Sequence, residues 1–195
     1  MALWTLRLAP DEPARTCIAA ALLHDAVNVP KDSPERASAS TLSAQLARQI
    51  LATHLDDDAL TRVAEAIRDH SYSRGARPQT DLGRALQDAD RLEALGALGL
   101  CRTLSCGARM GAQYFDPRDP WAHDRELQDT KFTVDHFFTK LLKLPATMNT
   151  TAGRDEAERR VAFMRAFLDQ LSEELGVPHS TGRGDGSRTR GRSGS

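Results

Sequence analysis

Residues 81–104 read DLGRALQDADRLEALGALGLCRTL, and this stretch decides the fold. Its apolar side chains recur every three or four residues, which is the spacing of one buried face of a helix. Asp81 stands at the start, where a carboxylate can accept hydrogen bonds from free backbone N–H groups. The stretch therefore predicts a single helix that Asp81 caps. Its buried face consists of Leu82, Leu86, Ala89, Leu92 and Leu95.

The same spacing of three and four runs along most of the chain, and few segments show the period of two that marks a strand. We therefore predict an all-α protein. Its first helix runs over residues 11–25, because Asp11, Glu12 and Pro13 provide a cap, an early acid and a proline. Its last helix ends at Gly176. The other predicted helices start at Ser33, at Asp56 and near Val134, and this last one turns Lys140 and Lys143 toward solvent.

The length of 195 residues favours one folded domain, residues 1–176, followed by a tail. Residues 177–195 hold five Gly, four Ser and four Arg, so they bury too little apolar surface to fold and are expected to be disordered. The whole chain carries 26 basic and 27 acidic residues. A balance of this kind gives no bulk attraction to nucleic acid or to anionic membranes. Nucleic acid is thus an unlikely partner, and a homodimer is compatible with the sequence.

The cysteines and the apolar runs give an indication of the cellular compartment of the protein. The chain has three cysteines in apolar surroundings, an odd number that suits reduced thiols better than a disulfide framework. The longest apolar run, Cys17 to Leu23, is far shorter than the roughly 20 residues that cross a bilayer. The first residues also lack the pattern of a secretory signal. These features predict a soluble cytoplasmic protein without membrane association.

Three polar residues stand at predicted helix ends. His24 and Asp25 follow the apolar run AALL, so at least one of them projects from the edge of a core. An imidazole beside a carboxylate suits a divalent metal that takes N and O ligands. A helix-end histidine satisfied within its own helix is the commoner arrangement. The same holds for His70, because the helix dipole favours a charged imidazole at that position.

Asp88 and Asp90 lie among the apolar residues of the 81–104 stretch. Aspartate has a poor helix propensity, so its presence inside a helix calls for a reason. Asp90 borders the buried face. From spacing alone, Asp90 is either a metal ligand or the ion-pair partner of Arg84 or Arg91.

These residues carry a resemblance to a known family. The segments AALLHD, AEAIRDHSYS and LQDADRLEALGALG, in this order, resemble the HD-domain superfamily of metal-dependent phosphohydrolases. The segments VPKDSPERASASTLSAQ and DHFFTKLLKLPATMNT resemble a branch of small stand-alone bacterial HD-domain proteins. The resemblance runs from Leu3 to Leu175. It implies a compact bundle of helices, in agreement with the all-α prediction.

The resemblance also implies a metal site. In the superfamily an early histidine, the adjacent His-Asp pair and a later aspartate hold the ion. Carried over, His24, Asp25 and Asp90 are the implied ligands of Mn, Mg or Co, with Mn preferred. The early histidine has no counterpart before His24, although LWTLRLAP resembles the end of the helix that carries it. Either the protein starts further upstream or this copy has lost the ligand, and the sequence leaves both open.

The implied activity is phosphohydrolysis of a small phosphorylated substrate, a nucleotide, by a reaction like that of nucleoside triphosphate pyrophosphohydrolases. His70 would donate a proton to a phosphate or to the leaving group. Asp32 would stand in for the acidic residue that helps to activate water in other members. Lys31 and Arg91 would bind phosphate, although Lys31, if exposed, is an ordinary surface lysine.

Two alternatives belong to other functional classes. A degenerate HD domain would bind a nucleotide or a protein partner without turnover, and the missing histidine favours it. A protein that binds RNA through its basic tail would lose that binding when residues 177–195 are removed.

Overall fold

The computed structural model describes residues 1–29, 38–71 and 75–179, and within these ranges it contains helices and loops but no strand. The all-α prediction is therefore confirmed. Ser33, the predicted cap of the second helix, lies outside the described residues. The elements are α1 Ala2–Leu8, α2 Ala14–Leu23, α3 Ala39–Leu51, α4 Asp57–Asp69, α5 Asp81–Glu93, α6 Gly96–Arg109, α7 Asp135–Thr139, the 3-10 helix η3 Leu141–Thr147, and α8 Thr151–Leu175.

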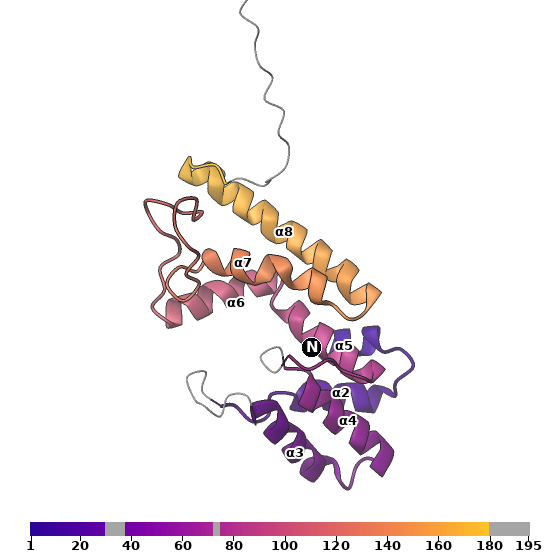
Figure 1. Ribbon diagram of the computed structural model, residues 1–195. Helices are drawn as coiled ribbons and strands as arrows, with labels where there is room; N and C mark the ends of the chain where they lie inside the picture. Colours follow the sequence, from indigo (N-terminus) through magenta and orange to yellow (C-terminus); the bar gives the residue numbers. More distant parts are fainter. Residues whose placement is uncertain (30–37, 72–74, 180–195) are drawn as a thin grey trace, which may run out of the picture.

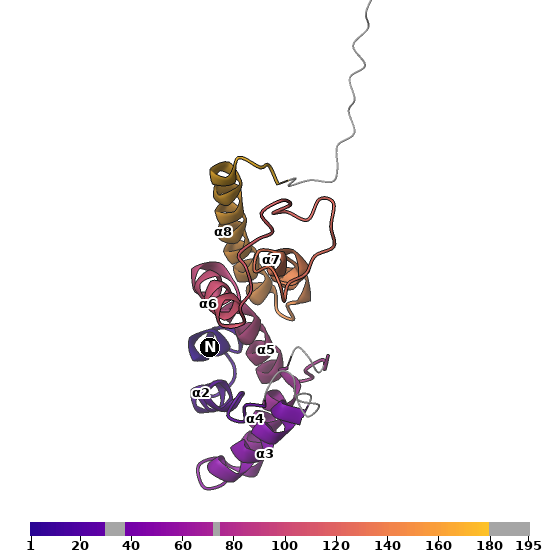
Figure 2. The same cartoon turned by 90° about the vertical axis from the view of Figure 1, so that its left-hand side faces the viewer.

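Helix α5 lies between two groups of helices (Figures 1 and 2). The N-terminal group, α1 to α4, contacts α5 through α1, α2 and α4. The C-terminal group, α6 to α8 with η3, contacts α5 through α6 and α8. Since α5 packs on both sides, its position decides where the two groups meet.

The apolar face predicted for this region is the centre of the core. Leu82, Leu86, Ala89, Leu92 and Leu95 are all at most 1% exposed. Burying a leucine side chain contributes roughly 1.5–3 kcal/mol to the free energy of unfolding, so this face alone fixes the orientation of α5.

The predicted single helix over residues 81–104 is wrong in two respects. Thr80, not Asp81, caps α5, because its hydroxyl accepts from the backbone N–H of Gly83 at 3.1 Å. The helix also breaks after Glu93, and α6 starts at Gly96 with a φ of +73°, a conformation that favours glycine. The break is stabilised from α8, where Arg160 donates to the carbonyl of Leu92 at 2.6 Å.

The start of α2 differs from the prediction as well. The helix begins at Ala14 with Pro13 at its cap position, and no side chain makes a capping hydrogen bond there. Asp11 is therefore not the cap. At the other ends the predictions hold: Asp56 caps α4 by accepting from Ala59 N–H at 2.8 Å, and Gly176 ends α8 in the left-handed conformation.

Asp88 anchors α8 to α5. Its carboxylate is fully buried and accepts four hydrogen bonds of 2.8–2.9 Å, two from Asn149 and two from Thr150. Thr150 in turn caps α8 through Gly153 N–H. Asp88 thus neutralises the free donors and the dipole at the start of α8, which explains a buried aspartate inside a helix.

Residues 177–179, the first three of the predicted tail, contact the domain. The carbonyl of Val177 accepts from the indole N–H of Trp121 at 2.7 Å, and the His179 ring lies 2.8 Å from Asp169. The predicted tail therefore begins with three residues that pack on the domain. Residues 180–195 lie outside the described part of the chain.

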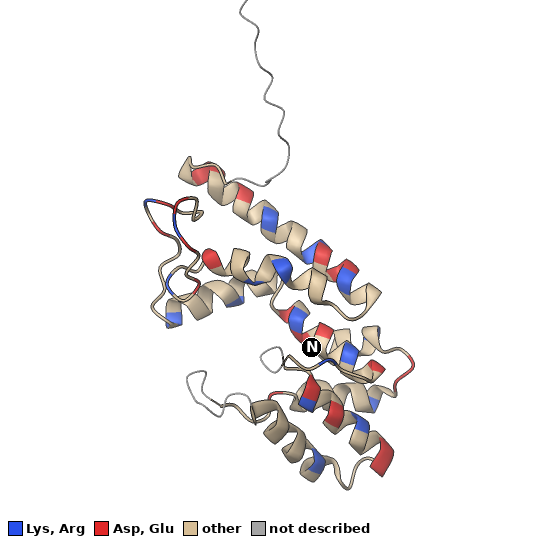
Figure 3. Cartoon of the chain, in the orientation of Figure 1, with Lys and Arg blue, Asp and Glu red and all other residues tan. Residues whose placement is uncertain are grey.

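Basic and acidic residues are interspersed along the helices of both groups, as the nearly neutral composition leads one to expect (Figure 3). All three cysteines are free, with Cys17 buried and Cys101 and Cys106 exposed. Within the described residues, no helix has the length and the apolar character needed to span a membrane.

Candidate active site

Two histidines from different helices meet at the junction of α2 and α4. His24 is the C-terminal cap of α2, and His70 is the C-terminal cap of α4. Their ring centroids are 5.0 Å apart in an edge-to-face arrangement. His70 is almost fully buried and His24 is half-buried. The packing of the two helices therefore brings together residues that are 46 positions apart in the sequence.

Both imidazoles are oriented by the last turn of their own helix. His24 Nδ1 lies 2.9 Å from the carbonyl of Ala21, and His70 Nδ1 lies 2.6 Å from the carbonyl of Ile67. A carbonyl only accepts, so Nδ1 carries a proton in both rings and Nε2 is the nitrogen left to face a ligand. A ring held in this way is typical of histidines that bind metal through the other nitrogen.

The two Nε2 atoms converge on Asp25. The distances from His24 Nε2 and His70 Nε2 to the Asp25 carboxylate oxygens are 3.5 and 3.6 Å. One ligand atom from each of the three residues lies within 4.8 Å of the others, a spacing that allows one ion to be shared. Two nitrogens and a carboxylate form a donor set that suits a divalent transition metal. The residues present therefore fit a metal ion.

Asp90 extends this cluster from α5. Its carboxylate lies 4.0 Å from His24 Nε2. The arginines proposed as alternative partners are engaged elsewhere: Arg84 binds Asp81 at 2.5 Å, and Arg91 donates to the carbonyl of Thr147. In the described part of the chain, neither arginine forms an ion pair with Asp90. The ligand role of Asp90 stays a prediction.

The electrostatics of His70 reflect the surrounding carboxylates. Burial acts to lower its pKa, but the hydrogen bonds to Asp25 and to the Ile67 carbonyl and the negative charges of Asp90 and Asp25 act in the opposite direction. The net result is a pKa above the ordinary value of a histidine. The cluster therefore favours a positive charge, whether it is a proton or a metal ion.

Of the remaining predicted site residues, two cannot be placed. Lys31 and Asp32 lie outside the described residues, and their roles stay predictions. Arg91, half-buried on α5, lines a cavity of about 380 Å³ that also includes Asp90. The cavity therefore opens directly beside the histidine cluster.

The other side of this cavity holds residues that the sequence reasoning missed. They are Arg102 from α6, Asp129 from the loop before α7, His136 from α7, and Lys140 at the C-terminal cap of α7. Lys140 was expected on the solvent side but lines the cavity. The reason is that α7 ends before it: Lys140 has φ −132° and ψ −60°, so the helical spacing no longer determines where its side chain lies. The segment DHFFTK could have pointed to His136 and Lys140, because it belongs to a stretch that resembles the branch of small bacterial HD-domain proteins.

Comparisons with known proteins identify the family of this chain. A family model of the HD domain matches residues 1–95. The chain is 34% identical to the Bacillus subtilis (strain 168) protein YpgQ over 161 residues, which is 80% of this chain and 70% of YpgQ.

Two solved structures are also similar. The crystal structure of Bacillus subtilis YpgQ in complex with ADP superimposes with a TM-score of 0.67 and 28% identity, covering 89% of this chain and 84% of that one. An HD-superfamily hydrolase from Bacillus thuringiensis gives a TM-score of 0.67 and 29% identity, covering 91% and 83%.

Proposed function

Because this chain belongs to the HD-domain superfamily, we propose that it is a divalent-metal-dependent phosphohydrolase. One observation carries the proposal: Nε2 of His24 and Nε2 of His70 meet Asp25 next to Asp90, at the edge of a cavity. The substrate is a small phosphorylated metabolite, a nucleotide, and the cleaved bond is a phosphoanhydride or a phosphoester. The ADP complex of YpgQ supports a nucleotide as the ligand class.

The ion would be held by His24, Asp25 and Asp90, with His70 as a fourth candidate ligand. Manganese is the preferred ion, with magnesium or cobalt as substitutes, because a set of two imidazoles and two carboxylates is borderline between hard and soft. When bound, the ion lowers the pKa of water and polarises a phosphoryl oxygen. The Ala21 and Ile67 carbonyls keep both rings in the required tautomer.

The chain's other groups orient the substrate and manage protons. Arg91, at the cavity edge next to Asp90, would bind a phosphate oxygen. If His70 stays outside the metal shell, its raised pKa suits the donation of a proton to the leaving oxygen. Asp32 and Lys31 keep the roles predicted from the sequence, activation of water and binding of phosphate.

The test is an assay of phosphate and pyrophosphate release. The full chain is incubated with a panel of nucleoside mono-, di- and triphosphates and with Mn(II), Mg(II) or Co(II). We expect metal-dependent release of pyrophosphate from triphosphates, and its loss in Asp25→Asn and Asp90→Asn. A metal-loaded chain that releases nothing from any nucleotide contradicts the hydrolase. If such a chain still binds nucleotide, it is the degenerate binding domain instead.

A further inference from the structure

The cavity beside Asp90 carries more positive than negative charge. Arg91, Arg102 and Lys140 line it as permanent cations. The acidic residues of its lining are Asp90, which the proposed function assigns to the metal, and Asp129. With Asp90 assigned in this way, the cavity offers an anion several cationic partners at a short distance from the metal cluster.

The Asp129 carboxylate already contacts two side chains of α7. Its Oδ2 lies 3.1 Å from His136 Nδ1 and accepts from the Thr139 hydroxyl at 3.1 Å. The hydrogen bond with His136 is the main reason why the pKa of Asp129 lies below its ordinary value. Since Nδ1 faces Asp129, Nε2 is the nitrogen that His136 can present to a ligand in the cavity.

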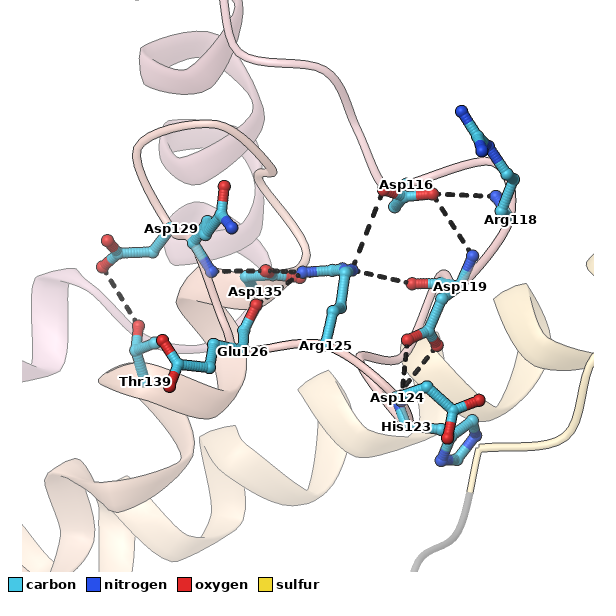
Figure 4. Close-up of polar contacts among 11 residues, drawn as sticks. Asp116, Arg118, Asp119, His123, Asp124, Arg125, Glu126, Asp129, Asp135 and Thr139 are labelled. Atoms are coloured by element: carbon cyan, nitrogen blue, oxygen red, sulfur yellow. Dashed lines mark hydrogen bonds and ion pairs between the residues drawn. The ribbon is translucent and has the colours of Figure 1, made fainter.

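A buried ion pair fixes this wall of the cavity (Figure 4). Asp135, the residue before His136, is fully buried and binds both terminal nitrogens of Arg125, at 2.5 and 2.8 Å. The same carboxylate accepts from the backbone N–H of Gln128 at 2.7 Å. The loop and the start of α7 are therefore held together, and His136 is presented on a rigid support. Because Asp135 neutralises Arg125, this arginine adds no charge to the cavity.

We propose that Arg102, His136 and Lys140 form a subsite for the phosphates of the substrate beyond the bond that is cleaved. This inference rests on the proposed function, which places the attacked phosphorus at the metal cluster. The phosphates that leave gain negative charge as the bond breaks, and cations fixed in advance stabilise that charge. Arg102 offers a planar fork that can bind two phosphate oxygens at once, whereas Lys140 acts as a compact charge.

Inorganic pyrophosphate is the probe, because it carries the phosphates without a nucleoside. Its affinity is measured by isothermal titration calorimetry on the full chain after removal of divalent metal, so that the metal cluster takes no part. Arg102→Met and Lys140→Met each remove a charge at nearly constant length, and Lys143→Met is the matched control because Lys143 is exposed and outside the cavity lining. His136→Asn keeps a donor for Asp129 but removes Nε2.

We expect Arg102→Met and Lys140→Met each to weaken pyrophosphate binding about tenfold, as the loss of a charged hydrogen bond does. His136→Asn weakens it severalfold, Lys140→Arg restores most of it, and Lys143→Met leaves it within about twofold. Melting temperatures show that each variant is folded. The subsite is overturned if the unchanged chain does not bind pyrophosphate, or if Lys143→Met weakens binding as much as Lys140→Met.

The two proposals can fail separately. If the chain hydrolyses nucleotides but the cavity variants bind pyrophosphate normally, the subsite is wrong and the hydrolase stands. If the cavity variants lose affinity in a chain that hydrolyses no nucleotide, phosphate binding by these residues is supported, and the hydrolase is contradicted together with the leaving-group role of the subsite.

Discussion

His24 and His70 reach the same geometry by the same local device. Each residue caps the end of a helix, where the last carbonyl groups have no partner within the helix. Each ring donates Nδ1–H to the carbonyl three residues earlier, and this single contact fixes both the tautomer and the ring direction. Two ordinary helix ends thereby direct two Nε2 atoms toward Asp25.

If His70 is a metal ligand, replacing it changes metal affinity. We expect His70→Ala to weaken Mn(II) binding at least tenfold, because one of the two imidazoles is lost. His54→Ala is the matched control, since His54 also follows a helix end but is exposed and does not belong to the cluster. Calorimetric titration with Mn(II) measures both. Equal affinity of the two variants would show that His70 acts outside the metal shell.

Asp88 and Asp90 are separated by one residue on α5, yet we expect opposite consequences from the same substitution. Asp88→Asn turns a buried acceptor of four hydrogen bonds into a group that must present an NH₂ to donors. Its cost is about 3 kcal/mol of unfolding free energy, measured by urea denaturation. Asp90→Asn changes stability by less than about 0.5 kcal/mol but lowers Mn(II) affinity.

Asp88→Asn and Asp90→Asn serve as controls for each other. If Asp90→Asn unfolds the chain as readily as Asp88→Asn, Asp90 has a structural role. If Asp88→Asn weakens Mn(II) binding in a chain of unchanged stability, the assignment of Asp88 to the start of α8 is wrong.

At this scale the sequence indicated His24, Asp25 and Asp90, because a motif carries them. It did not indicate that His70 would share Asp25 with His24, since that depends on how α2 packs on α4. Arg102 and His136 were missed for the same reason. Their neighbours in the cavity come from other elements, and no local pattern records those contacts.

Among the elements, α5 and α8 are joined by a chain of charged contacts. Glu156 binds Arg159 at 2.7 Å and Arg160 at 2.6 Å, and Arg160 donates to the Leu92 carbonyl at the end of α5. The hydrogen bonds from Arg159 and Arg160 lower the pKa of Glu156. A carboxyl whose pKa is lowered on folding stabilises the fold above its unfolded pKa, and this stabilisation is lost as the pH falls through the folded value.

The prediction for Glu156→Gln is therefore a pH-dependent difference. At pH 7 the variant is less stable than the unchanged chain. The gap narrows as the pH falls below the unfolded pKa of about 4.3, and it closes once the pH is also below the lowered pKa of the folded state. Melting temperatures between pH 3 and pH 7 measure the gap. The control is Glu174→Gln near the end of the same helix, whose exposed carboxylate accepts from Gln170 and binds no arginine in the described contacts. A gap that stays constant with pH contradicts the ionic role of Glu156.

Helix ends followed from the sequence at Asp56 and Gly176, but not at Asp11 or Asp81. The break between α5 and α6 did not, because Leu92 and Leu95 keep the helical spacing up to it. What stabilises the break is Arg160, 68 residues further on. A contact at that separation leaves no trace in a local pattern.

For the molecule as a whole, α5 places the candidate site at the junction of the two groups of helices. The N-terminal group provides His24, Asp25 and His70, α5 adds Asp90 from its exposed border, and the C-terminal group completes the cavity. Neither group contains both the histidine cluster and the cations Arg102 and Lys140 that line the cavity. A substrate that reaches from one to the other therefore contacts both groups, and its binding energy would hold them in place.

The C-terminal residues provide the last test at this scale, because two truncations separate docking from the remaining tail. Ending the chain after His179 keeps every described contact, so we expect its stability to be unchanged. Ending it after Gly176 removes the acceptor of the buried Trp121 indole N–H and the contacts of His179 with Asp169 and Trp121. The expected loss is about 2 kcal/mol, from one unsatisfied donor and one ring contact.

Urea denaturation of the three chains measures this difference, and the pyrophosphate-release assay is run on the same samples. Equal stability of the two truncated chains would show that residues 177–179 do not support the domain. Because the contacts of Trp121 and His179 lie away from the metal cluster and the cavity lining, we expect both truncations to keep the activity. A protein that worked by binding RNA through its tail would instead lose its function in both.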